Sequence, residues 1–125
     1  GAQVGTAYLA TPEATISDLH RAALAAAGDD ASQVTNLFSG KPARGLRNRV
    51  MREIGPLSDE APPFPTAGGA LAPLKKAAEA AGKADFSSLW AGQAAALARP
   101  GGAAEVTERL VAEAGAHLTR LSRGW

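Results

Sequence analysis

The sequence contains no cysteine, and only 5% of its 125 residues are aromatic. The absence of cysteine excludes disulfide bonds, thiolate metal ligands and a thiol nucleophile. The scarcity of aromatic residues, together with abundant alanine, favours helices and a thin core of small side chains. The two histidines, His20 and His117, lie far apart, and neither has neighbours typical of a metal site or a catalytic triad. We expect both to be surface residues.

Long apolar runs and an excess of charge of one sign are also missing. The apolar runs are short and rich in alanine, far below the ~20 residues of a membrane-spanning helix. The first residues lack the basic and apolar regions of a signal peptide, so we expect a cytoplasmic protein. The formal net charge of +1 implies no general attraction to nucleic acid or to membranes.

Local patterns predict a mostly helical chain with two strands. Residues 1–9 are typical of a short strand and turn, with Ala2 and Val4 buried. Thr11 followed by Pro12 and Glu13 is typical of a helix start, which predicts a helix over 12–27. A second strand is expected over 33–38. Apolar spacing predicts further helices over 46–54, 70–82, 86–98 and, most clearly, from Val106 to Leu121.

Four of the eight prolines fall within residues 55–69, which predicts an extended loop. A loop of this kind is either a linker or a lid over a site. Five cations precede it in twelve residues. They favour a solvated face over a nucleic-acid patch, because no aromatic residue is interleaved and acidic residues follow. These cations are Lys41, Arg44, Arg47, Arg49 and Arg52. The alternative for Arg44 is a structural role as a brace for the loop.

The first candidate site is the Gly5-Thr6 turn between the expected strand and the expected helix. Glycine lets a ligand approach the backbone closely, and the threonine hydroxyl can donate a hydrogen bond. A helix amino terminus nearby would favour negative charge, so the geometry suits a phosphate. A plain connection between strand and helix is the alternative.

Three blocks in order resemble a known family. The first runs from Gln3 to Ala14 and begins Gln-Val-Gly-Thr. The second, from Val34 to Asn48, contains Phe-Ser-Gly-Lys-Pro-Ala-Arg where the family has Phe-Ser-Gly-Arg-Pro-Ala-Arg. The third is Trp90-Ala91-Gly92-Gln93. Together they resemble the nitronate monooxygenases, also called 2-nitropropane dioxygenases, which are FMN-dependent TIM barrels.

The resemblance implies an α/β fold: the C-terminal part of an FMN-binding (β/α)8 TIM barrel followed by a mostly helical region. Residues 1–30 would be the end of the barrel, with its last strand, phosphate-binding turn and helix. Residues 31–125 would hold a strand, the proline-rich loop and helices that cover the barrel. A complete barrel needs about 250 residues. We therefore expect this chain to be part of the enzyme, with the remainder covalently attached or a separate chain.

The resemblance also implies the site and its chemistry. Gln3, Val4, Gly5 and Thr6 would bind the FMN phosphate and its surroundings, and residues 40–66 would help cover the substrate side. The enzyme would oxidise alkyl nitronates with O2, without a metal. The family's catalytic histidine lies upstream, so no catalytic residue is expected in this chain.

Several alternatives stay open. Within the same barrel type, an FMN-dependent enoyl reductase or an NAD(P)H:quinone reductase would share this region. A free-standing helical interaction module without catalysis is an alternative of another class. The Trp90–Gln93 turn would approach the flavin or substrate cavity, or would be a packed helix start with Gln93 capping. Tyr8 would line the pocket or pack as an ordinary aromatic.

Overall fold

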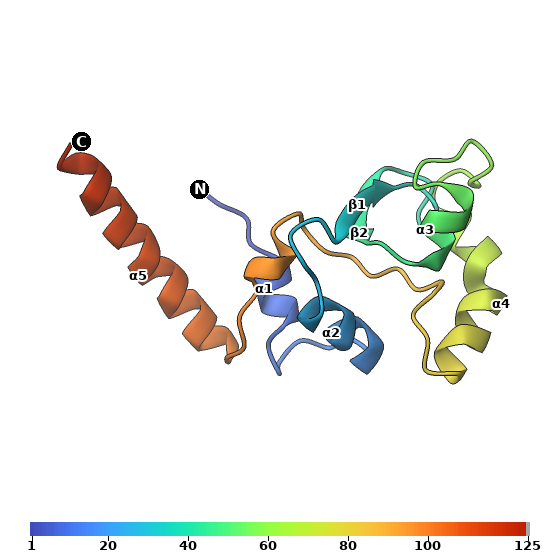
Figure 1. Ribbon diagram of the computed structural model, residues 1–125, viewed down its shortest axis with the longest axis horizontal. Coiled ribbons are helices and arrows are strands. Elements are labelled where there is room, and N and C mark those ends of the chain that lie inside the picture. The colour runs from blue at the N-terminus through green and yellow to red at the C-terminus, as the bar shows by residue number, and fades with distance from the viewer. Residues whose placement is uncertain (125) are drawn as a thin grey trace.

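The computed structural model describes residues 1–124, which form an α/β arrangement with two strands. Figure 1 shows three parts in a row: the long C-terminal helix at one end, the N-terminal helices in the middle, and the hairpin with the helices that follow it at the other end. The elements in chain order are α1 (Thr6–Leu9), α2 (Asp18–Ala25), β1 (Ser32–Thr35), β2 (Ala43–Leu46), α3 (Arg49–Ile54), α4 (Ala67–Ala80), the 3-10 helix η1 (Ala95–Leu97) and α5 (Ala103–Ser122). Each helix within residues 1–124 is too short or too polar to cross a bilayer.

The first nine residues differ from the prediction. Residues 1–5 form no regular element, and residues 6–9 are helical instead of extended. Ala2 and Val4 are exposed, and Val4 keeps 42% of its surface accessible. A strand is stable only when a neighbour takes up its backbone hydrogen bonds, and no strand within residues 1–124 lies beside this segment.

The helix expected over 12–27 is shorter than predicted. It begins at Asp18, because the Ser17 hydroxyl accepts the His20 amide and provides the cap. Thr11 is not a cap, because it is buried and its hydroxyl donates to the Tyr8 carbonyl. The Arg21 guanidinium donates to the Thr11 and Ala14 carbonyls, which holds residues 11–17 as a turn.

The strand expected over 33–38 is confirmed in part as β1, which pairs with the unexpected strand β2 in an antiparallel hairpin. Val34 lies opposite Arg44. The connection needs Gly40, whose φ is +82° and whose missing side chain leaves room for the Pro62–Phe64 backbone. Because β2 takes up residues 43–46, the following helix starts three residues later than predicted.

That helix, α3, is capped by Asn48, whose side-chain oxygen accepts the Met51 amide. The Asn48 side-chain nitrogen donates to the Ser87 carbonyl at 2.8 Å. The predicted helix over 70–82 is confirmed as α4, which begins at Ala67. The proline-rich loop between α3 and α4 is fastened to the hairpin by Asn36, which bonds both backbone groups of Ser58.

The prediction of a helix over residues 86–98 is wrong. Within this range only η1 is helical, and Trp90 instead forms an isolated bridge with Gly45 of β2. The Leu46 amide donates to the Leu89 carbonyl, and the Ala91 amide donates to the Arg44 carbonyl. Backbone groups engaged with a strand cannot also make helical bonds, so tertiary pairing overrides the helical pattern.

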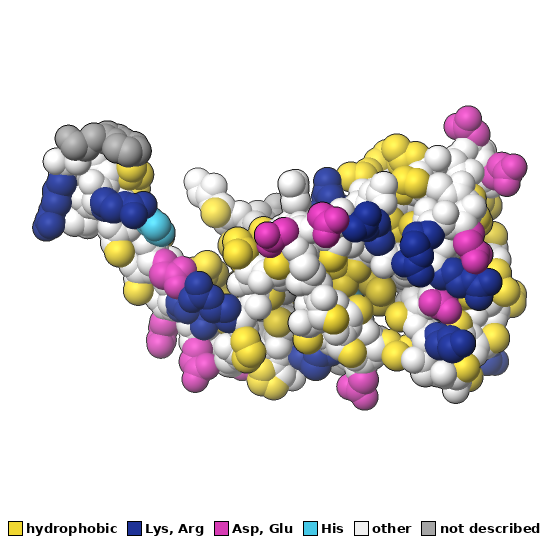
Figure 2. All heavy atoms as spheres, in the orientation of Figure 1, with side chains coloured by type: hydrophobic (Ala, Val, Ile, Leu, Met, Phe, Trp, Pro, Cys, Tyr) yellow, Lys and Arg dark blue, Asp and Glu magenta, His cyan; other side chains and the backbone are white. Residues whose placement is uncertain are grey.

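Two apolar clusters form the core. One joins Leu24 of α2 to Leu46, Leu89 and Ala95, and the other joins Leu37 to Val50 and Met51 of α3. The last predicted helix is confirmed as α5, but Val106 is the only residue of α5 that is buried within the described chain. Figure 2 shows α5 standing apart from the rest, with charged side chains along it.

Candidate functional site

Three separate segments meet beside α1. The Thr6 hydroxyl accepts a hydrogen bond from the Gly92 amide at 2.8 Å, and the Ala91 amide bonds the Arg44 carbonyl of β2 at 3.2 Å. These residues come from the three sequence blocks, which span positions 3–93. They line an open hollow of about 360 Å³, whose walls are Gly5, Thr6, Leu9, Arg44, Trp90, Ala91 and Gly92.

The start of α1 has the groups that an anion needs. The first amides of any helix have no acceptor within it. Within the described chain, the amides of Gly5, Thr6 and Ala7 have no protein acceptor. A side chain built on Gly5 would meet nothing within 4 Å, so its backbone is open to an approaching ligand. The residues present therefore suit a phosphate.

The Thr6 hydroxyl is free to donate a hydrogen bond to a ligand. Its oxygen accepts the Gly92 amide, which occupies one lone pair and leaves the hydroxyl proton for another acceptor. Gln3 and Val4, the other two predicted binding residues, are exposed and do not line the hollow. Their assignment to the cofactor stays a prediction.

Arg44 supplies a cation at the same place. One guanidinium nitrogen is held by the Ser32 carbonyl at 3.1 Å and the Ser32 hydroxyl at 3.3 Å. Arg44 is half-buried, and no carboxylate within residues 1–124 forms an ion pair with it. A partly buried positive charge without a counter-ion makes the surroundings favourable for an anion.

The other four cations of the basic cluster are exposed, as expected of a solvated face. Arg47 pairs with Asp30 at 3.1 Å, and Arg49 pairs with Glu53 at 2.7 Å one helical turn away. The Glu53 carboxylate raises the pKa of Arg49.

Trp90 is half-buried and packs edge-on against Phe38, with ring centroids 5.8 Å apart. The prediction of a packed helix start at Trp90–Gln93 is therefore wrong. The first residues of this segment are held against β2 and line the hollow beside Thr6. Gln93 is exposed.

His20 contradicts its prediction as a surface residue, because its exposure is only 9%. Its Nε2 lies 3.0 Å from the Trp90 carbonyl oxygen. The His20 side chain faces inward because it lies on the same face of α2 as Leu24, which packs on the apolar cluster that includes Leu89 and Ala91. His117 is exposed on α5, as expected. Neither histidine lines the hollow.

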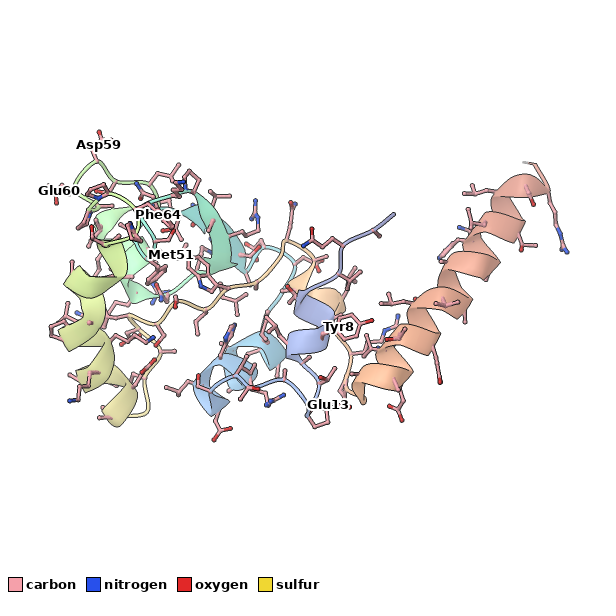
Figure 3. All side chains as sticks on the ribbon, turned by 180° about the vertical axis from the view of Figure 1, so that it is seen from behind. Tyr8, Glu13, Met51, Asp59, Glu60 and Phe64 are labelled. Carbon is pink, nitrogen blue, oxygen red and sulfur yellow. The ribbon has the colours of Figure 1, made fainter. Side chains whose placement is uncertain are left out.

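A polar contact that the sequence did not indicate joins the α1 region to α5. The Tyr8 hydroxyl lies 2.8 Å from the Thr107 hydroxyl, and a Glu13 carboxylate oxygen accepts the Ala103 amide at 2.9 Å. Figure 3 shows Tyr8 and Glu13 next to the first turn of α5. The hydrogen bond from the Ala103 backbone lowers the pKa of Glu13.

A second hollow of about 140 Å³ lies between α3, the proline-rich loop and α4. Its walls are mainly apolar, and Glu60 is its one titratable lining residue. No glycine of the three family blocks lines this second hollow. Among the described residues, no group of three His, Asp or Glu side chains is placed to hold a metal ion.

The family model described as nitronate monooxygenase matches residues 1–113. The chain belongs to the nitronate monooxygenase family. A probable nitronate monooxygenase of Staphylococcus saprophyticus is 32% identical over 120 residues, which cover 96% of this chain and 34% of that protein. The nitronate monooxygenase of Pseudomonas aeruginosa is 39% identical over 112 residues, 89% of this chain and 32% of its own length.

A solved structure described as nitroalkane oxidase from Streptomyces ansochromogenes is 40% identical and superposes with a TM-score of 0.81. It covers 94% of this chain and 34% of the solved chain. The chain thus spans about a third of the length of the nitronate monooxygenases it matches. The resemblance on the three blocks is confirmed at the level of the family.

Proposed function

We propose that this chain is part of an FMN-dependent nitronate monooxygenase, which oxidises alkyl nitronates with O2. It would supply the edge of the flavin-phosphate pocket and part of the substrate-side cover. The observation that supports the proposal most is the meeting of Thr6, Arg44 and Gly92 around one hollow, because each comes from a different block of the family resemblance.

The fit to FMN rests on this chain's own groups. The open backbone at Gly5 and the free first amides of α1 would donate to the phosphate. The Thr6 hydroxyl would add a donor that the Gly92 amide already orients. Gln3 would also contact the cofactor, and Val4 would do so through its backbone only. FMN, when bound, supplies the redox chemistry between nitronate and oxygen.

The apolar walls of the hollow would exclude water from one side of the cofactor. The Leu9 and Ala91 side chains have no hydrogen-bonding groups, and the Trp90 ring packs on Phe38. A site that excludes water strengthens the electrostatic interactions inside it. No base for proton abstraction lines the hollow within residues 1–124, so the proton-transfer group would come from another part of the enzyme.

We further propose that residues 1–30 complete an FMN-binding (β/α)8 barrel whose other strands lie outside this chain. Residues 1–5 would gain a partner there and become extended. Residues 31–125 would cover the barrel. Alkyl nitronate and O2 would be its small-molecule substrates, and the cytoplasm its location.

The test combines a spectrum with an assay. The purified enzyme is expected to show flavin absorption bands and to release nitrite from an alkyl nitronate while it consumes oxygen. A protein that stays colourless after incubation with FMN would contradict the proposal. NADH or NADPH oxidation with enoyl thioesters, or with quinones, would favour the reductases of the same barrel type.

A second candidate substrate is the neutral nitroalkane. It is favoured by the solved structure described as nitroalkane oxidase, which is 40% identical to this chain. The same oxygen assay separates the two, when the nitronate and its parent nitroalkane are added at equal concentration before they interconvert.

A further inference from the structure

We propose that His20 is a positioning residue of this site, which holds the Trp90–Gly92 backbone so that the Gly92 amide orients Thr6. The inference rests on the proposed function and assigns a role to a buried side chain that touches neither the hollow nor a substrate. His20 Nε2 lies 3.0 Å from the Trp90 carbonyl oxygen, and Thr6 Oγ1 lies 2.8 Å from the Gly92 amide.

The direction of the Trp90 carbonyl follows from the strand geometry. Gly45 and Trp90 are an antiparallel pair, and the hydrogen bonds on either side of them come from their neighbours, Leu46 to Leu89 and Ala91 to Arg44. In such a pair the two residues' own carbonyls point away from each other. The Trp90 carbonyl therefore faces away from β2, and His20 of α2 meets it there.

Within residues 1–124, His20 is the only donor to this carbonyl. A carbonyl oxygen accepts and cannot donate, so the Nε2 atom must carry a proton. A neutral ring in this place is the Nε2–H tautomer. His20 is 9% exposed and belongs to a helix that packs on the apolar cluster, so the donor has little freedom to move.

The His20 hydrogen bond affects Thr6 through the backbone of Ala91 and Gly92. The segment from Leu89 to Gly92 is fastened on one side by β2, on another by His20, and at its end by Thr6. Without the His20 bond, the Trp90–Ala91 peptide would be held by the Ala91 amide alone, and the Gly92 amide would lose part of its alignment with the Thr6 oxygen. Thr6 would then be free to use its hydroxyl elsewhere instead of presenting it to an anion.

The test compares His20→Leu, which removes the donor, with His20→Gln, whose amide nitrogen can replace Nε2. FMN affinity of the apo-enzyme is measured by quenching of flavin fluorescence. Loss of one oriented hydrogen bond predicts about a three- to tenfold weaker FMN affinity for His20→Leu, and less than about a twofold change for His20→Gln. His117→Leu and His117→Gln on the exposed face of α5 are matched controls that should bind FMN as the wild type does.

A coupling measurement separates positioning from a general loss of stability. In the Thr6→Val background, His20→Leu is expected to weaken FMN binding no further, because the hydroxyl that it orients is already gone. Equal losses in both backgrounds would overturn the inference, as would a His20→Leu enzyme that binds FMN like the wild type. Should His20→Leu fail to fold, His20→Asn, whose amide is too short to reach the Trp90 carbonyl, takes its place: equal losses of FMN affinity on this change in the wild-type and Thr6→Val backgrounds would overturn the inference.

FMN binding by the wild-type enzyme tests the proposed function separately from the role of His20. If the wild-type enzyme takes up no FMN, the proposed function fails, whatever the His20 variants do. If the wild type binds FMN and the His20 variants do not differ from it, the function stands and the positioning role fails. Nitrogen-15 chemical shifts of the His20 ring provide a further readout, because the proposal requires the proton on Nε2.

Discussion

The Thr6 hydroxyl and the Gly92 amide are joined by a 2.8 Å hydrogen bond, although 86 residues separate them in the sequence. This bond connects the helix start at α1 with the extended segment that pairs with β2. It places the first and the third of the family's blocks at one hollow. The candidate site therefore forms only in the tertiary structure. Its residues and their neighbours lead to the separate predictions below.

Replacing Gly5 by alanine should weaken FMN binding without destabilising the fold. The added methyl group meets no protein atom within 4 Å, and the Gly5 φ of −115° is open to any residue. The methyl would instead occupy the space through which a phosphate approaches the backbone. We expect the dissociation constant for FMN to rise by about tenfold or more.

Thermal unfolding checks the fold of this variant, and flavin fluorescence measures its affinity. Gly115→Ala on α5 is the matched control, since the methyl group added there also meets no protein atom within 4 Å. It should leave FMN affinity unchanged. Unaltered affinity in Gly5→Ala would show that the phosphate does not approach there.

Thr6→Val removes the oxygen but keeps the shape of the side chain. The variant loses both the acceptor for the Gly92 amide and the proposed donor to the phosphate. A hydrogen bond to a charged group predicts that FMN binds about tenfold more weakly, with riboflavin affinity unchanged. Thr6→Ser retains the hydroxyl and should restore most of the FMN affinity. A Thr6→Val enzyme that discriminates FMN from riboflavin as well as the wild type does would contradict this role.

Asn48→Ala should destabilise the hairpin–α3 region. Asn48 is buried, caps α3, and bonds the Ser87 carbonyl at 2.8 Å. Loss of the cap and of a buried donor predicts a decrease of about 2–3 kcal/mol in the free energy of unfolding. Urea denaturation measures it, and the exposed Arg49→Gln serves as the control. A loss no larger than that of the control would show that water replaces the asparagine.

The attachment of α5 is expected to weaken in acid. The Ala103 amide hydrogen bond lowers the pKa of Glu13, so the carboxylate is favoured in the folded state. A lowered folded pKa adds stability above the ordinary value of 4.5, and this stability is lost as the pH falls through the lower folded value.

Hydrogen exchange of the Ala103 amide, recorded from pH 6 downward to about pH 3, measures this loss. Glu13→Gln keeps an acceptor oxygen but cannot ionise, so its Ala103 protection should lose this pH dependence. Glu108→Gln on the same helix is the control and should retain it. The same pH profile for Glu13→Gln as for the wild type would exclude Glu13 as the titrating group.

Local signals were sufficient for the elements that depend on their own residues. The apolar spacing predicted α4 and α5, and the β-branched run predicted β1. The same reasoning failed at residues 86–98, because the bonds of Leu89 and Ala91 go to β2. It also failed at residues 1–5, where a strand needs a neighbour that local sequence does not reveal.

The candidate site was predicted only in part. Gly5 and Thr6 were found from the turn pattern and the family resemblance, and both line the hollow. Arg44 was interpreted as one of five cations of a solvated face or as a brace for the loop, and nothing in its local sequence indicated that it would line the same hollow as Thr6. His20 was placed on the surface because its neighbours in sequence are not typical of a metal site or a catalytic triad, whereas the packing of Leu24 on Leu89 and Ala91 turns its face of α2 inward.

A titration of the apo-enzyme with FMN and, in parallel, with riboflavin tests whether this hollow binds the flavin phosphate. We predict one FMN bound per enzyme, with riboflavin bound at least about tenfold more weakly because it lacks the phosphate that Gly5 and Thr6 would hold. Equal affinity for the two flavins, or binding of neither, would contradict the assignment of this hollow to the flavin phosphate.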